Sequence, residues 1–472
     1  MNVCHRAHFL TVFFSLTKYF WVLLLPVARA VLAFGFDYKN AFKGYEADIF
    51  LLFILFCYAL SRWLCTCVQI SGGDIIYKRG LILRKTVKVT AENTSCIKLW
   101  QNPFSVIFRC FILRVYQNPT QKPIIKMYCT RQTAEEIKKL CLMDEDKLTR
   151  YKSSPLLHSL IFSSSKGGFL VLSAMLSFLG VVTGKTVRVI AEENLAVLSD
   201  VARDIPSLLI ALGLFLLLIR LISLLLEMFY VSDMRIYEQK DYMLIKRGIL
   251  RKSLYRISTK KENLGYIVST NSIFLCRYYS LYAGIAGFGQ EKYDSPLILP
   301  IADKAAAKKM KTQIFGDIQR GKNKVFAGRN AIGSYVTKWF VIYILSCLVF
   351  SAVASTGLLG NSPYLALLVP LCILFVIFVC VNKWRYSYVS ITDNAIVLRT
   401  VKGIKISEYT VSRDKCRRIQ IKQNFLQKRK GVADLCLSLR GNRNKKVRIR
   451  HIPIEKCMEI AEKPRFSLTK QL

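Results

Sequence analysis

Two stretches, "IYKRGLILRK" at residues 76–85 and "LIKRGILRK" at residues 244–252, are nearly identical although they lie far apart in the chain. A related run, "TVKGIKISEY", follows at residues 400–409. In each run a basic residue precedes a glycine between residues typical of β-strands (Arg79-Gly80, Arg247-Gly248 and Lys402-Gly403). Self-similarity of this kind is typical of repeated modules. The sequence therefore predicts three copies of one unit in which the turn glycines are structural, with Gly80 and Gly248 as candidates for positive φ.

The residues after each turn follow a recurring order that predicts a small antiparallel β domain. An isoleucine (Ile97, Ile267 or Ile419) precedes an asparagine motif, "QNP" at 101, "TNS" at 270 and "KQN" at 422. Short runs rich in Val, Ile and Tyr, separated by Gly and Asn, are typical of such strands. Each block ends in a helical pattern: "TAEEIKKLCLM" with a Thr133-x-x-Glu136 capping box, "DKAAAKKMKTQI", and "IPIEKCMEIAEK".

Hydropathy predicts that helix pairs alternate with these β domains. Hydrophobic residues make up 53% of the chain, and long apolar stretches approach the roughly 20 residues that a helix needs to cross a membrane. We therefore expect six transmembrane helices in three pairs. The predicted spans are 19–36, 47–64, 168–184, 206–226, 339–359 and 363–381.

The formal net charge of +40 favours an anionic partner, and its distribution favours a membrane over nucleic acid. Most Lys and Arg residues lie in three hydrophilic blocks, 62–167, 227–338 and 382–472. By the positive-inside rule, these blocks and both termini are cytoplasmic. The cysteines, which avoid the short loops outside, are expected to be reduced. The expected location is a membrane that the chain crosses several times, with the three blocks on its cytoplasmic face.

The expected domain order alternates helix pairs with β domains. The boundaries are 1–64 for the lead and first helix pair, 65–150 for the first β domain, 151–230 for the second pair, 231–316 for the second β domain, 317–383 for the third pair, 384–465 for the third β domain, and 466–472 for the tail.

This organisation resembles the bacterial pleckstrin-homology (PH)-like membrane proteins of the YdbT type. The resemblance lies in "YKRGLILRK" with "IKLWQNPFSVIFRCFILRV", "IKRGILRK" with "IVSTNSIFLCRYYSLYAGIAG", and "TVKGIKISEY" with "IQIKQNFLQKRKGVADLCLSL". It implies a PH-like fold, in which two packed antiparallel sheets form a β-sandwich or barrel closed by a C-terminal helix. It implies no established catalytic activity.

Basic clusters are the candidate binding residues, because Lys and Arg supply charge-assisted donors to phosphate groups. A solvated or membrane-apposed surface, a specific head-group site and a protein-binding surface all stay open as interpretations. Nucleic-acid binding lacks a supporting motif. The candidates for binding anionic lipid or a partner are Lys78, Arg79, Arg84, Lys85, Lys246, Arg247, Arg251, Lys252, Lys428, Arg429, Lys430, Arg443, Lys445 and Lys446.

Enzymatic patterns are missing from the sequence. The four histidines are scattered, and no nucleophile elbow, phosphate loop or metal-ligand spacing is present. We expect no catalytic residue, metal or cofactor. The expected function is a non-enzymatic membrane scaffold or interaction protein with three PH-like domains, whose partner is a membrane protein or a second copy. Envelope maintenance or defence is the interpretation given to this role. The alternative is a transporter or export component with Arg29 and Arg220 on a polar path through the helices.

Overall fold

The fold was analysed in a computed structural model of the 472-residue chain. The structure describes residues 4–16, 45–71, 74–80, 84–90, 93–101, 103–117, 122–141, 148–149, 158, 218, 221–222, 224–238, 241–249, 252–260, 262–273, 277–289, 294–315, 324–328, 332–355, 364–392, 395–403, 405–412, 415–441, 445–462 and 468–471.

Strands and closing helices occur three times in the same order, which confirms the predicted β repeats. The first repeat comprises β1 (Cys4–Arg6), β2 (Cys67–Ser71), β3 (Asp74–Arg79), β4 (Lys85–Thr90), β5 (Thr94–Trp100), β6 (Phe111–Gln117), β7 (Ile125–Cys129) and helix α7 (Arg131–Cys141). The second comprises β8 (Leu148–Thr149), β9 (Arg235–Glu238), β10 (Tyr242–Arg247), β11 (Ser253–Ser258), β12 (Leu264–Ser272), β13 (Tyr278–Ile285), β14 (Leu297–Asp303) and α11 (Lys304–Phe315). The third comprises β15 (Lys324–Phe326), β16 (Tyr388–Ile391), β17 (Ala395–Lys402), β18 (Lys405–Ser412), β19 (Cys416–Lys422), β20 (Val432–Leu439), β21 (Lys445–Pro453) and α15 (Ile454–Glu462).

Neighbouring repeats share sheets. Sheet A has the order β1-β2-β3-β4, and sheet B has the order β7-β6-β5-β11-β10-β9-β8. Sheet C has the order β14-β13-β12-β18-β17-β16-β15, and sheet D has the order β21-β20-β19-β22, where β22 is Leu468–Gln471. Antiparallel pairing of β11 with β5 joins repeats in sheet B, and pairing of β18 with β12 joins repeats in sheet C.

The chain divides into two compact units, and the division runs through the second repeat. Unit 1 comprises residues 1–150, 233–263 and 285–290, and unit 2 comprises residues 151–232, 264–284 and 291–472. Sheets A and B thus belong to unit 1, whereas sheet D and almost all of sheet C belong to unit 2.

Two-layer packing in the first and third repeats is that of the expected β-sandwich. In unit 1, Val68 and Val89 of sheet A share a core with Leu113 of sheet B and Ile137 of α7. The corresponding core of unit 2 joins strands of sheets C and D to α15. Alternation in β21, "KKVRIRHIP", produces this burial, because Val447 points inward while its neighbours Lys446 and Arg448 are exposed.

Equivalent hydrogen bonds recur in the two sandwiches. Trp63 Nε1 donates to the carbonyl oxygen of Ala7 at 2.6 Å, and Trp384 Nε1 donates to that of Gly328 at 3.2 Å. The asparagine motifs recur in the same way. Gln101 Nε2 donates to Cys110 O, and Gln423 Nε2 donates to Val432 O. These glutamines fix the connection from the fifth to the sixth strand of their repeats, so their role is structural.

The turn glycines Gly80 and Gly248 have the predicted backbone conformation, and Gly403 shares it. Their φ angles are 124°, 92° and 61°, which side-chain-bearing residues seldom adopt. The capping box predicted at Thr133 is wrong in position, because α7 begins earlier, at Arg131. Thr133 lies inside the helix, where its hydroxyl contacts that of Thr130 at 2.9 Å.

The predicted fold class of six membrane-spanning helices is wrong. Strands dominate the described fold, and its helices nowhere reach the length and apolar character needed to cross a membrane. Among the predicted spans, 19–36 and 168–184 lie outside the described residues.

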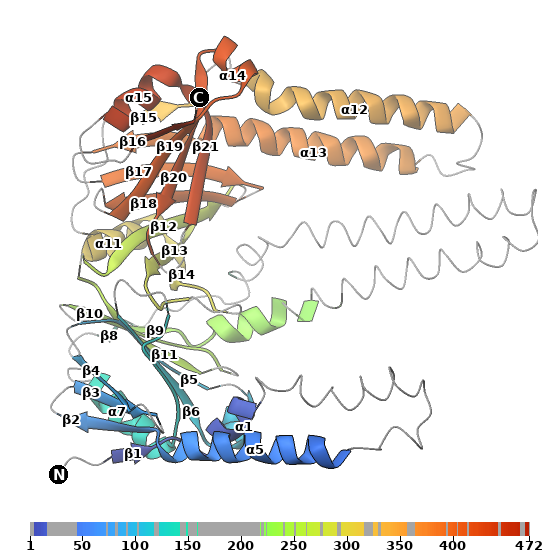
Figure 1. The fold of residues 1–472 in the computed structure, drawn as a ribbon. Coiled ribbons are helices and arrows are strands. Elements are labelled where there is room, and N and C mark those ends of the chain that lie inside the picture. The colour runs from blue at the N-terminus through green and yellow to red at the C-terminus, as the bar shows by residue number, and fades with distance from the viewer. Residues whose placement is uncertain are drawn as a thin grey trace, which may run out of the picture. The chain divides into compact units, whose positions relative to one another are not determined.

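Three long helices coincide with other predicted spans. These are α5 (Tyr45–Leu64), α12 (Ile332–Ser355) and α13 (Tyr364–Tyr386), of which α12 and α13 lie side by side (Figure 1). Charged residues lie near the ends of these helices, as Asp48 and Arg62 do in α5 and as Lys383 and Arg385 do in α13. Apolar composition over a stretch was therefore not enough to predict a span, because the helices include polar residues at their ends.

Candidate anion-binding site

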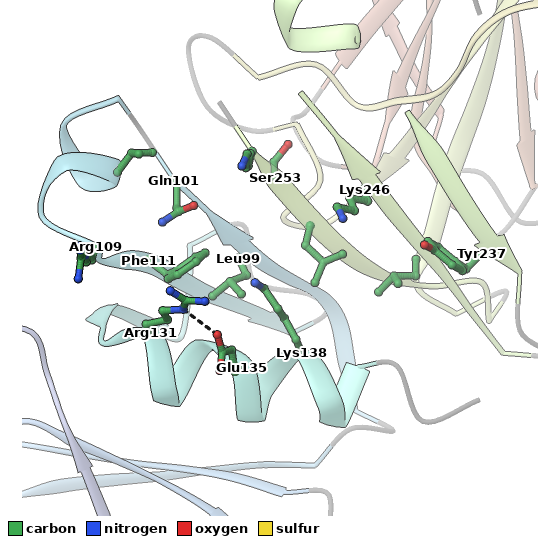
Figure 2. A pocket seen from close by; sticks show the side chains of 14 residues that line it. Leu99, Gln101, Arg109, Phe111, Arg131, Glu135, Lys138, Tyr237, Lys246 and Ser253 are labelled. Carbon is green, nitrogen blue, oxygen red and sulfur yellow. Dashed lines mark hydrogen bonds and ion pairs between the residues drawn. The ribbon is translucent and has the colours of Figure 1, made fainter. Parts of the chain in front are cut away.

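A cavity of about 610 Å³ lies in unit 1 where the first and second repeats share sheet B. Leu99 of β5 and Leu254 of β11 contribute to its apolar floor, because these strands are paired with Leu99 opposite Leu254. Helix α7 lies along one side, and the connection from α6 (Pro103–Ile107) to β6 forms another (Figure 2). The cavity is therefore built from two repeats.

Five basic side chains surround the cavity. Arg109 follows α6 in a left-handed conformation, with φ of 50°, and Lys246 lies on β10. Arg131 and Lys138 lie about two turns apart on one face of α7, and Lys252 directly precedes β11. Figure 2 shows the α7 side chains opposite Lys246. Four different elements thus place positive charge around one space.

Among the described lining residues Glu135 is the one acidic side chain, and it is already bonded. Arg131 Nε donates to Glu135 Oε1 at 2.8 Å. This hydrogen bond lowers the pKa of Glu135 below its ordinary value, so the carboxylate is ionised at neutral pH. It offsets one of the five cations and leaves the cavity with a positive excess.

The neighbouring basic residues affect the pKa of Lys138. Its ammonium lies 4.7 Å from the centre of the Phe111 ring. Burial lowers the pKa of Lys138, Glu135 opposes this shift, and Lys246, Arg131 and Lys252 lower the pKa further by repulsion. An anion in the cavity would relieve that repulsion and stabilise the charged ammonium. The site is therefore suited to a phosphate or carboxylate group.

Uncharged polar side chains add hydrogen-bonding groups to the basic lining. Ser253, Gln101 and Tyr237 are described lining residues with uncharged polar groups that can complement an anion, and the Gln101 amide already donates to Cys110 O. Histidine and cysteine are missing from the described lining, so it holds neither a general base of that kind nor a thiol nucleophile. Across the described part of the chain, no group of three His, Cys, Asp or Glu residues is placed to hold a metal ion.

Some of the basic residues predicted to bind anions in the first two repeats line the cavity, and others lie elsewhere. Lys246 and Lys252 line the cavity. Arg247, in contrast, is 1% exposed, and its guanidinium lies over the Tyr255 ring at 4.8 Å. Arg251 lies outside the described residues. The equivalent cluster of the first repeat is exposed at the turn between β3 and β4, away from the cavity lining; its members are Lys78, Arg79, Arg84 and Lys85.

Basic candidates of the third repeat lie on the surface of unit 2. Lys428 and Arg429 are at the end of α14 (Phe425–Arg429), with Lys430 directly after it. Lys445 and Lys446 are exposed at the start of β21. Arg443 lies outside the described residues, as do Arg29 and Arg220 of the predicted polar path.

Sequence reasoning missed Arg109, Arg131 and Lys138. The spacing of Arg131 and Lys138 along a predicted helix indicates that they share a face. That face could not be connected to Lys246, because the pairing of β5 with β11 joins segments more than a hundred residues apart. Strand register between repeats was the missing information.

Repeated β-sandwiches closed by a helix, with a basic cavity at the junction of two repeats, define a class of protein built from small β domains. The chain belongs to the bacterial PH domain family, whose profile matches residues 12–144 and 340–464, more than half of the sequence. This match confirms the PH-like part of the expected resemblance. No curated protein and no solved structure matches the chain.

Proposed function

We propose that this protein is a non-enzymatic interaction protein whose unit 1 cavity binds phosphate head groups at an anionic membrane surface. The observation that carries the proposal is the cluster of five cations around a cavity with one carboxylate, itself bonded to Arg131. Lys and Arg donate charge-assisted hydrogen bonds to phosphate oxygens.

Charge supports the choice of a lipid surface. A basic side chain near an anionic leaflet contributes about 1 kcal/mol to binding, so the residues around the cavity can together hold the chain at such a surface. The chain also carries 70 Lys and Arg against 30 Asp and Glu, which favours association with an extended anionic surface. The proposed setting is the cytoplasmic face of a bacterial membrane, a compartment in which cysteine thiols stay reduced.

A scaffold role follows from the repeats. Three PH-like modules in one chain can hold a membrane surface with one site while other surfaces bind a protein partner. In this proposal the protein resembles the YdbT type in its organisation and acts in the envelope without chemistry of its own.

The test is sedimentation of the full chain with phosphatidylcholine vesicles that contain or lack about one fifth phosphatidylglycerol. The double variant Lys246→Gln and Lys252→Gln should weaken binding to the anionic vesicles by about thirtyfold, because two charges that contribute about 1 kcal/mol each near the lipid are lost. The matched control is Lys308→Gln with Lys309→Gln, two exposed lysines of α11 outside the cavity.

Three outcomes decide the proposal. A loss confined to the cavity variant, with binding to the anionic vesicles only, supports it. Equal losses in both double variants would show diffuse attraction without a role for the cavity. If inorganic phosphate at millimolar concentration protects the wild type against unfolding but the vesicles do not bind, the cavity holds a free anion and the membrane part of the proposal is wrong.

A further inference from the structure

The fourth strand of each repeat has one edge that can pair with a strand of another repeat. β11 of the second repeat pairs antiparallel with β5, and β18 of the third repeat pairs antiparallel with β12. β4 is the equivalent strand of the first repeat, and it ends sheet A (Figure 1). Within the described residues, β4 pairs with β3 and its other edge carries no strand.

The residues of the two paired strands, β11 and β18, are more buried than those of β4. Along β11 and β18 most residues are buried, including Tyr255 and Thr410, which have no measurable exposure. Along β4, by contrast, Lys85, Thr86 and Lys88 are exposed. β4 therefore presents the backbone edge that its two counterparts use for pairing, and an open edge is a template for an added strand.

We propose that the free edge of β4 binds an extended, acidic segment of a partner protein as an additional antiparallel strand. Lys85 and Lys88 lie on the strand, and Arg79 lies directly across the hairpin from Lys85. Asp74, at 3.0 Å from Lys88, supplies one opposing charge. Acidic side chains on an incoming strand would pair with the remaining cations, because opposite charges across strands are stabilising.

A second copy of this chain is a poorer occupant of the edge. The pattern of the repeats would place β19 of a second copy beside β4, as β5 and β12 lie beside β11 and β18. β19 carries Arg417 and Arg418, and like charges opposite each other are destabilising. β22 also already pairs with β19, in parallel. The lysines of β4 thus discourage pairing between copies while they favour an acidic strand.

The test is fluorescence anisotropy of an eight-residue peptide of alternating Val and Glu, titrated with the full chain. Two peptide controls have Lys in place of Glu, or carry N-methyl groups on alternate residues so that one edge cannot donate hydrogen bonds. In the protein, Lys85→Glu reverses one charge at the edge. Lys402→Glu is its matched control, because Lys402 is an exposed residue at the equivalent turn of the third repeat, where β18 is already covered.

The expected result is binding of the acidic peptide about tenfold or more tighter than either control peptide. Lys85→Glu should weaken that binding by about tenfold, whereas Lys402→Glu should change it less than twofold. Equal binding of the N-methylated peptide, equal losses in the two variants, or no binding up to about 1 mM would overturn the proposal. Self-association in sedimentation velocity that Lys85→Glu abolishes would overturn it in favour of a second copy.

Discussion

Asp434 joins three segments of unit 2, and replacing it with Ala tests how much that junction contributes to stability. The residue lies on β20 and is 1% exposed. Its Oδ1 accepts hydrogen bonds from Gln427 Nε2 at 2.8 Å and from the backbone N–H of His451 at 3.0 Å. Its Oδ2 accepts from Arg448 Nε at 2.9 Å and Nη2 at 2.5 Å.

The expected loss follows from what Asp434→Ala leaves behind. The buried N–H of His451 would lose its acceptor, which costs about 1–3 kcal/mol, and Gln427 would lose a charge-assisted hydrogen bond of similar worth. Arg448 is half-exposed, and water can replace its ion pair at little cost. His451 also has a φ of 58°, a conformation that its bond to Asp434 supports. We expect unit 2 to lose about 3 kcal/mol of unfolding free energy.

The assay is native-state hydrogen exchange of β20 and β21 amides in the full chain, because it reports on unit 2 without assuming that the whole chain unfolds in one step. Arg448→Ala is the control and should cost about 1 kcal/mol or less. Asp434→Asn keeps one carbonyl acceptor and should fall between the two. A loss below about 1 kcal/mol in Asp434→Ala, or a loss as large in Arg448→Ala, would refute the view that the buried hydrogen bonds rather than the ion pair stabilise this junction.

Further predictions concern both units. Gly248→Val should destabilise unit 1 by about 1–3 kcal/mol, because Val is strained at a φ of 92°; unchanged resistance of the β10–β11 hairpin to limited proteolysis would contradict it. Burial and then Lys445 lower the pKa of Lys405 to about 8, partly opposed by Glu227. The unfolded state therefore binds the proton more tightly, and wild-type stability should rise from about pH 8 towards the unfolded pKa near 10.5, while Lys405→Met should abolish that rise in denaturant titrations. Neutralising Lys428, Arg429 and Lys430 should reduce vesicle binding of the full chain in a graded, salt-sensitive manner; salt-resistant binding lost in one single variant would show a fitted site instead.

The repeated β modules could be predicted from the sequence, because each module has its own local sequence signals. Turn glycines, alternating strands such as β21 and a helix after the last strand were all predictable, and the φ angles of Gly80 and Gly248 follow from the turn they share. Arg247 shows the limit of that reasoning. It follows the exposed Lys246 in a motif that looks uniformly basic, but strand alternation turns it inward, where aromatic rings contact its guanidinium.

The helices were less predictable than the strands. A window of apolar residues can indicate a membrane span. In α5 the apolar residues lie at the centre, whereas Asp48 and Arg62 lie near the ends, so the mean hydropathy of the central window does not apply to the whole helix. The candidate site was missed for another reason. Arg131 and Lys246 share one cavity only because β5 pairs with β11, and no local pattern specifies which edge strands of a repeat protein meet.

Sharing of sheets gives the chain a basic cavity that a single module would not have. Arg131 and Lys138 come from the first repeat and Lys246 and Lys252 from the second, so the cavity exists only where two repeats are joined. Repetition of a weakly basic module thus produces a strongly basic site at the junction without adding any new motif. Of the three equivalent strands β4, β11 and β18, β4 is the one whose second edge is open within the described residues. Edge pairing between repeats therefore accounts for both the proposed anion site and the proposed site for an acidic strand.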